Sequence, residues 1–189
     1  MIESIGQQLL RIMYTRVGPR IHTRAAELVT SMRPRVLLDI GSANALLASA
    51  LMDRGYTPQV YVALDPDPVL LTHAKPGPAL ERVMGVAESL PLRSYSVDLS
   101  VFYDSLHHLG NPDKALEEAA RVSECILVDD IDPERLPGRL VALLERLLGF
   151  PAQFIDANTL VEKLEEKRLR VIVVRKTRWL PTYRTLACR

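Results

Sequence analysis

The chain has 189 residues, of which 48% are hydrophobic and 25% are charged, so it can bury a substantial core and is not a disordered protein. Its formal net charge of +1 gives no bulk attraction to nucleic acid or to an anionic membrane. No signal peptide is evident and no apolar run reaches the roughly 20 residues needed to span a bilayer, so we expect a cytoplasmic protein.

The two cysteines, Cys125 and Cys188, lie far apart in the sequence and form no paired spacing. Such a pattern suggests neither a disulfide framework nor a zinc site. A reduced cytosol is therefore the expected compartment.

The hydrophobic periodicity alternates between strand and helix along the chain. An amphipathic helix is predicted to end near Gly18, and a second over 21–32. Further helices are predicted over 43–54, 112–122, 133–148 and 158–167, with a short one opening at Pro66 or Pro68. Strands are predicted over 36–40, 60–64, 82–86, 98–102, 125–128 and 171–174. This alternation indicates an α/β fold with a mainly parallel sheet and helices on both faces.

The last strand should run the other way. Only residues 175–182 separate the strand ending at Val174 from the apolar segment 183–188. A parallel connection needs a dozen or more residues. The final strand is therefore predicted to be antiparallel to the one before it.

Two strand ends carry the pattern of a nucleoside-binding site. The apolar run 36–40 ends at Gly41 and continues as Ser42-Ala43-Asn44-Ala45, and the run 60–64 ends at Asp65. Backbone that approaches a ligand closely at one strand end, with a carboxylate at the next to meet ribose hydroxyls, suits a nucleoside cofactor. A nicotinamide cofactor is disfavoured because the glycine spacing of a dinucleotide fingerprint is missing.

Together these segments resemble the class I S-adenosylmethionine-dependent methyltransferases, nearest the branch that includes the ubiquinone and menaquinone biosynthesis enzymes. The resemblance covers residues 35–189 and also rests on the segments 85–91 and 96–109. It implies a Rossmann-like seven-stranded sheet with an antiparallel C-terminal strand, and it leaves residues 1–34 as an N-terminal helical cap. It further implies in-line methyl transfer from S-adenosylmethionine to a small molecule.

The resemblance also implies the residues that bind the cofactor, some from the glycine loop, some from the second strand end and some from the loop beside the adenine. They are Asp39, Gly41, Ser42, Ala43, Asp65, Pro66, Ala87, Glu88 and Tyr103. Two departures matter. Alanine stands at 43 and 45 where the family commonly has glycine. Alanine does not readily take positive φ, so cofactor binding is expected only if both residues keep negative φ and the ligand stands slightly away. Valine stands at 86, where an aspartate usually accepts a hydrogen bond from the adenine.

The candidate catalytic residues are Tyr103, His107 and His108, which follow the strand predicted over 98–102. A histidine near a transferring methyl can take a proton from an attacking hydroxyl. The alternative is that paired histidines at a helix start serve packing or capping.

Two further groups are assigned structural roles. The carboxylates of Asp129, Asp130 and Asp132 could form an oxygen-rich Mg²⁺ site with Asp104. The preferred interpretation is that these carboxylates are solvated charges at the strand end and helix start. No metal is therefore expected. A leucine stripe is expected to contact the core, with a partner or lipid surface as the alternative; it comprises Leu140, Leu143, Leu144, Leu147 and Leu148.

Two other functions stay open. An RNA or protein methyltransferase would use a basic excess near the start of the chain, formed by Arg11, Arg16, Arg20, Arg24, Arg33 and Arg35. A non-catalytic scaffold that retains the methyltransferase fold would explain Ala43, Ala45 and Val86. A homodimer is compatible with either.

Overall fold

The computed structural model describes residues 23–75, 77, 79–149, 152–176 and 181–189. The predicted helix near Gly18, and with it most of the proposed 1–34 cap, lies outside the described residues.

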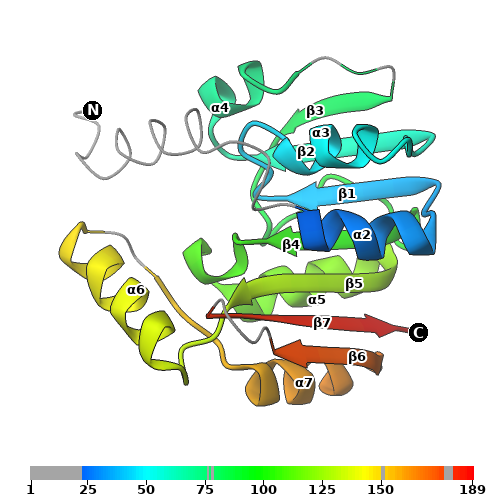
Figure 1. The fold of residues 1–189 in the computed structure, drawn as a ribbon. Helices are drawn as coiled ribbons and strands as arrows, with labels where there is room; N and C mark the ends of the chain where they lie inside the picture. Colours follow the sequence, from blue (N-terminus) through cyan, green and yellow to red (C-terminus); the bar gives the residue numbers. More distant parts are fainter. Residues whose placement is uncertain (1–22, 76, 78, 150–151, 177–180) are drawn as a thin grey trace.

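One seven-stranded sheet forms the centre of the fold, with strand order β3-β2-β1-β4-β5-β7-β6 (Figure 1). The strands are β1 (Val36–Ile40), β2 (Val60–Asp65), β3 (Leu80–Met84), β4 (Val97–Tyr103), β5 (Ser123–Ile131), β6 (Arg170–Lys176) and β7 (Thr182–Cys188). The first five run parallel, and β7 lies antiparallel to both β5 and β6. The predicted fold class and the reversed last strand are confirmed.

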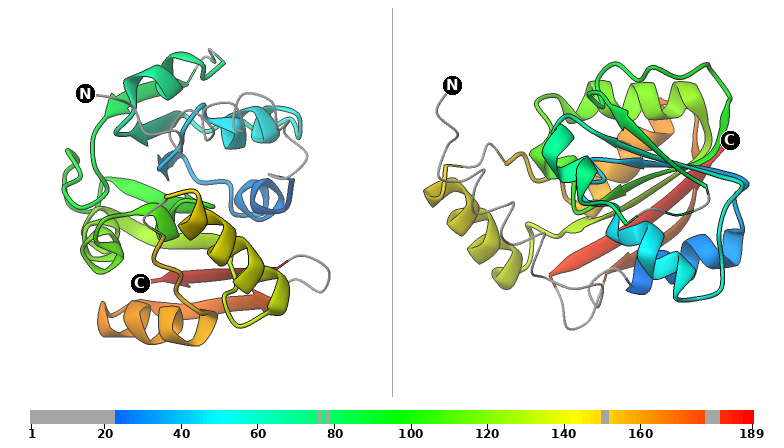
Figure 2. Two further views of the ribbon diagram at one scale, coloured as in Figure 1. Left: turned by 90° about the vertical axis from the view of Figure 1, so that its left-hand side faces the viewer. Right: turned by 90° about the horizontal axis from the view of Figure 1, so that it is seen from above.

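Helices cover both faces of the sheet (Figures 1 and 2). On one face α2 (Thr23–Met32), α3 (Leu46–Met52) and α4 (Pro68–Thr72) bury residues such as Ala25, Leu47 and Leu71 against β1 and β2. On the other face α5 (Pro112–Val122) and α7 (Ala157–Glu166) bury Ala115 and Leu160. The apolar strands are therefore enclosed from both sides, as a parallel sheet requires.

Helix α3 begins at Leu46, three residues later than the predicted start at 43. Ala43 and Ala45 adopt φ of 46° and 54°, so the condition of negative φ at these residues is not met, and the two alanines take the left-handed backbone that glycine usually takes. Left-handed backbone cannot continue a right-handed helix, and residues 41–45 instead form a tight loop. After the other end of α3, Gly55 adopts φ 70°, as is typical of a glycine that follows a helix.

The leucine stripe does not contact the core. It lies on α6 (Leu136–Leu147), which projects beyond the carboxyl ends of the parallel strands (Figure 2). The side chains of Leu140, Leu143, Leu144, Leu147 and Leu148 are all exposed. The expected core contact is wrong because α6 turns other residues to the body. A Cβ on Gly138 would lie 1.9 Å from the Asp132 carbonyl oxygen, and Glu145 lies 3.6 Å from His107.

Cys125 and Cys188 form a disulfide, contrary to the sequence expectation. The pairing of β5 with β7 places the two residues directly opposite each other, with Cα atoms 4.1 Å apart. A long sequence separation therefore says nothing against this disulfide, because antiparallel register brings the two cysteines together.

Candidate functional site

The loop after β1 is held in place by its own backbone hydrogen bonds. The N–H groups of Gly41 and Ser42 both donate to the Leu64 carbonyl oxygen, at 2.9 and 3.0 Å. The Ala43 N–H donates to Asp65 Oδ2 at 2.8 Å. These three amides are thus engaged within the protein, so the loop offers a ligand close backbone contact and not a ring of free donors for phosphate.

Gly41 is required at its position for two reasons. Its φ is +70°, and a Cβ built on it would lie 2.7 Å from the Ser105 Cβ. Ser105 is itself fixed, since its hydroxyl donates to the Ile40 carbonyl oxygen at 2.7 Å. The glycine therefore allows the loop to pack against the segment after β4.

A small open pocket lies beside this loop at the carboxyl ends of β1 and β4. Its lining residues are Asp39, Gly41, Ser42, Ala43, Asn44, Leu46, Leu47 and Tyr103. The Ser42 hydroxyl oxygen is buried without a hydrogen-bond partner in the protein. Since buried polar atoms are nearly always satisfied, this hydroxyl is available to a water or to a polar ligand in the pocket.

Asp39 is the buried carboxylate of the pocket. Its Oδ2 accepts a hydrogen bond from the Tyr61 hydroxyl at 2.5 Å. Burial raises the pKa of Asp39 to about 7, although the bond from Tyr61 opposes the shift. A cationic ligand beside it would favour the charged carboxylate. The sequence analysis did not identify Tyr61 as a site residue. The available sign was a tyrosine hydroxyl within an otherwise apolar strand, since such a buried hydroxyl needs a hydrogen-bond partner.

Asp65 is buried at the end of β2 and holds two backbone amides. One carboxylate oxygen accepts from the Ala43 N–H and the other from the Asp67 N–H, each at 2.8 Å. Burial raises the pKa of Asp65, and these two bonds oppose the rise. Its carboxylate therefore couples the loop after β1 to the start of α4, where Asp67 is the N-cap.

The residues predicted around the adenine lie apart from the pocket lining. Pro66 is exposed, Ala87 is buried in the core, and Val86 is 48% exposed. Glu88 Oε1 accepts from the Asn111 N–H at 3.0 Å, at the start of α5. In this structure the Glu88 carboxylate thus supports the start of a helix.

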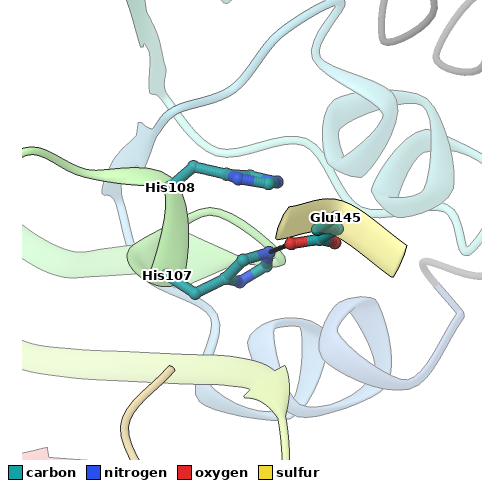
Figure 3. A group of neighbouring side chains, drawn as sticks. All are labelled: His107, His108 and Glu145. Carbon is teal, nitrogen blue, oxygen red and sulfur yellow. Dashed lines mark ion pairs between the residues drawn. The ribbon is translucent and has the colours of Figure 1, made fainter. Parts of the chain in front are cut away.

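A second polar group lies at the short helix η1 (Leu106–His108) after β4. His107 Nδ1 is 2.5 Å from Asp130 Oδ1, and its Nε2 is 3.6 Å from Glu145 Oε2 on α6 (Figure 3). The His107 ring also stacks on Phe154 at 4.6 Å. Burial opposes the protonated ring, but the Asp130 charge and hydrogen bond outweigh it and raise the pKa of His107 well above its ordinary value.

His108 and Asp104 border the same group. The His108 ring lies 3.9 Å from that of His107, and burial lowers the pKa of His108 to about 4. Burial raises the pKa of Asp104 to about 6, against the charge of His107. Of the three predicted catalytic residues, Tyr103 lines the pocket while His107 and His108 belong to this neighbouring group.

The carboxylates at the end of β5 are not solvated, so that interpretation is wrong. Asp129 pairs with Arg184 on β7, Asp130 binds His107, and Asp132 is fully buried. Strand β5 continues to Ile131 because β7 pairs with it that far. Glu145 was missed by sequence reasoning, since nothing in the leucine-rich segment around it singles it out.

No described helix has the length and apolar character needed to cross a membrane.

Residues 38–124 match the methyltransferase domain family. No curated protein matches the sequence. Among solved structures, a chain from the complex of the Haloferax volcanii Trm112 methyltransferase activator with a methyltransferase is similar at a TM-score of 0.80 and 14% identity, covering 100% of this chain and 99% of that one.

Two further structures show the same fold. A SAM-dependent methyltransferase of Thermotoga maritima has a TM-score of 0.74 and 15% identity, covering 97% of this chain and 96% of its own. Magnesium protoporphyrin IX methyltransferase of Synechocystis, solved with bound SAH, has a TM-score of 0.71 and 12% identity, covering 100% and 89%. The chain thus contains a segment that matches a methyltransferase domain family, and it has the fold of these S-adenosylmethionine-dependent methyltransferases.

Proposed function

We propose that the chain transfers the methyl group of S-adenosylmethionine to a small molecule by in-line displacement at the pocket beside Gly41. The observation that carries this proposal is the pocket itself. The loop after β1 is held by backbone hydrogen bonds to β2. It carries the Ser42 hydroxyl, which is buried in the pocket lining without a hydrogen-bond partner in the protein. A polar ligand without phosphates fits such a site.

The cofactor would be held by three parts of the chain. The loop from Gly41 to Ala43 gives close backbone contact, and Ser42 supplies a hydroxyl. Asp39 supplies a carboxylate for a cationic group. Asp65 would accept from the ribose hydroxyls while its bonds to the loop persist, because each carboxylate oxygen has a second lone pair. Pro66, Ala87 and Glu88 would border the adenine.

When bound, S-adenosylmethionine supplies a methyl group activated by a sulfonium. The protein's task is then to hold the acceptor in line with that methyl and to exclude water. Tyr103 would contact the acceptor, a role supported by its position in the pocket lining at the end of β4. His107 Nδ1 is hydrogen-bonded to Asp130. His107 would therefore hold neighbouring side chains in position and would not accept a proton from the acceptor.

A small-molecule acceptor is favoured over RNA because the net charge of +1 gives no bulk attraction to phosphate. On the resemblance of the sequence, we place the acceptor among quinone-like or other apolar molecules.

Calorimetry with S-adenosylhomocysteine and S-adenosylmethionine tests the cofactor part. We expect saturable binding that Asp65→Ala weakens by about tenfold or more, as loss of a charged hydrogen-bond partner predicts. The matched control is Asp53→Ala, on the exposed end of α3.

Labelled methyl transfer into separated small-molecule, RNA and protein fractions tests the acceptor. Label in the small-molecule fraction supports the proposal, and label in RNA or protein contradicts the acceptor class. Absence of heat with either ligand would leave the non-catalytic scaffold as the remaining account.

A further inference from the structure

We propose that His107, His108 and Glu145 form a binding site for a divalent transition metal of the Zn²⁺ type. The three side chains come from η1 and α6 and converge at one point (Figure 3). Their ligand atoms lie within 4.8 Å of one another. This proposal does not depend on the proposed methyl transfer.

The first argument is the state of two buried atoms. His107 Nε2 and Glu145 Oε2 both lack a hydrogen-bond partner, although His107 is only 1% exposed. They face each other at 3.6 Å, which is too long for a hydrogen bond. The two groups form a long ion pair when His107 is protonated, and a metal ion bound to both atoms would satisfy them more fully.

The second argument is the distance. Two ligands about 2.1 Å from one ion at the tetrahedral angle lie about 3.4 Å apart. The 3.6 Å between His107 and Glu145 is close to that value. A rotation of the His108 ring, which sits 3.9 Å from the His107 ring, would complete the set.

The third argument is the support behind His107. Asp130 binds its Nδ1 at 2.5 Å and its backbone N–H at 3.2 Å. Because Asp130 holds the Nδ1 proton, a metal ion that displaces the Nε2 proton would find the Nε2 lone pair directed toward Glu145. This is the arrangement that orients a metal-binding histidine.

The ligand types select the metal. Two imidazole nitrogens and one carboxylate suit Zn²⁺ and its neighbours, whereas Mg²⁺ and Ca²⁺ prefer oxygen donors. Three protein ligands would leave a fourth position for water or for an oxygen of a small molecule. The Mg²⁺ alternative from the sequence used Asp130 as a ligand, together with other carboxylates at this end of the sheet. In the site proposed here, Asp130 instead holds His107 and does not bind the ion.

The test is Zn²⁺ binding to the full chain after treatment with a chelator. Metal content after dialysis and competition against a chromophoric chelator give stoichiometry and affinity. We expect about one Zn²⁺ per chain. Glu145→Gln should weaken binding at least tenfold, and Asp130→Asn should weaken it by about 10–100-fold.

Matched controls are Glu162→Gln and His73→Ala, both at exposed residues, and neither should change the affinity. Mg²⁺ should not compete with Zn²⁺ at equal concentration. Binding of S-adenosylhomocysteine by each variant reports a folded protein, so a failed metal site is distinguishable from a failed cofactor site.

No bound Zn²⁺, or equal affinity in the parent and in Glu145→Gln, would overturn the proposal. His107 would then be an imidazolium shared by two carboxylates.

Discussion

Gly41 and Ser105 are in contact across the carboxyl ends of β1 and β4, and no side chain fits between them. A Cβ at Gly41 would lie 2.7 Å from the Ser105 Cβ, and the φ of +70° disfavours any other residue. This contact joins the loop after β1 to the segment that carries His107 and His108.

We therefore expect Gly41→Ala to lower the free energy of unfolding by about 2 kcal/mol or more, because left-handed strain of about 1–2 kcal/mol adds to the clash. Binding of S-adenosylhomocysteine should be lost as well. Gly55→Ala is the control, since Gly55 has the same φ of +70° and nothing within 4 Å of its Cβ direction. It should cost about 1 kcal/mol and leave binding intact. Equal losses for both variants would contradict the contact.

The two alanines of the loop give a second prediction. Ala43 has φ 46°, so Ala43→Gly relieves left-handed strain of about 1–2 kcal/mol. This gain offsets two losses: a buried methyl group, worth about 0.8 kcal/mol, and the lower backbone entropy of the unfolded alanine chain. We expect a change in the free energy of unfolding within about 1 kcal/mol. Ala50→Gly, buried within helix α3, has no strain to relieve and should cost about 2 kcal/mol. Chemical denaturation compares them, and a cost at Ala43 as large as at Ala50 would disprove the strain.

Asp39 predicts a pH dependence of stability. Its pKa is raised from 3.8 to about 7 in the folded protein, so between these values the folded state holds a proton that the unfolded state has lost. The contribution of this bound proton to the free energy of unfolding is therefore fully present below pH 4 and is lost as the pH rises through 7.

Asp39→Asn should remove this decline and raise the free energy of unfolding at pH 8, by on the order of 1–4 kcal/mol. The same variant should weaken binding of the cationic S-adenosylmethionine, because the charge is gone. Denaturation at pH 5 and pH 8 provides the measurement, with Asp53→Asn as the exposed control. A parallel pH profile in Asp39→Asn and the parent would refute the assignment.

The disulfide gives a fourth prediction. Cys125 and Cys188 close a loop with a sequence separation of 63, so reduction should lower the free energy of unfolding by about 2–4 kcal/mol. The double variant Cys125→Ser/Cys188→Ser should show the reduced stability with or without reductant. Mass spectrometry of the alkylated protein counts free thiols. Two alkylated cysteines in the untreated protein would show that the bond does not form under those conditions.

Much of the fold could be predicted because it depends on local pattern. The strand runs, the Pro112–Val122 helix and the antiparallel return of 182–188 follow from periodicity and loop length, and the structure has each of them. The Asp67 N-cap and the Gly55 turn follow from residue type in the same way.

The errors share another cause, since each depends on a neighbour distant in sequence. The positive φ of Ala43 is imposed by bonds to Leu64 and Asp65 in the next strand. The disulfide depends on the register of β7 against β5. Glu88 binds the start of α5, and Glu145 meets His107 only because α6 lies over η1. No pattern within a short window contains these contacts.

The insertion of β7 between β5 and β6 has a consequence for proteolysis. Strand β6 pairs with β7 and with no other described strand, while β7 alone covers the far side of β5. After a protease cut just before Thr182, the Cys125–Cys188 disulfide would still tie the final segment to β5, and only reduction would release it. Its release would expose unpaired amides and carbonyls on both β5 and β6. Such rows recruit other chains, so a clipped and reduced molecule would be prone to aggregate.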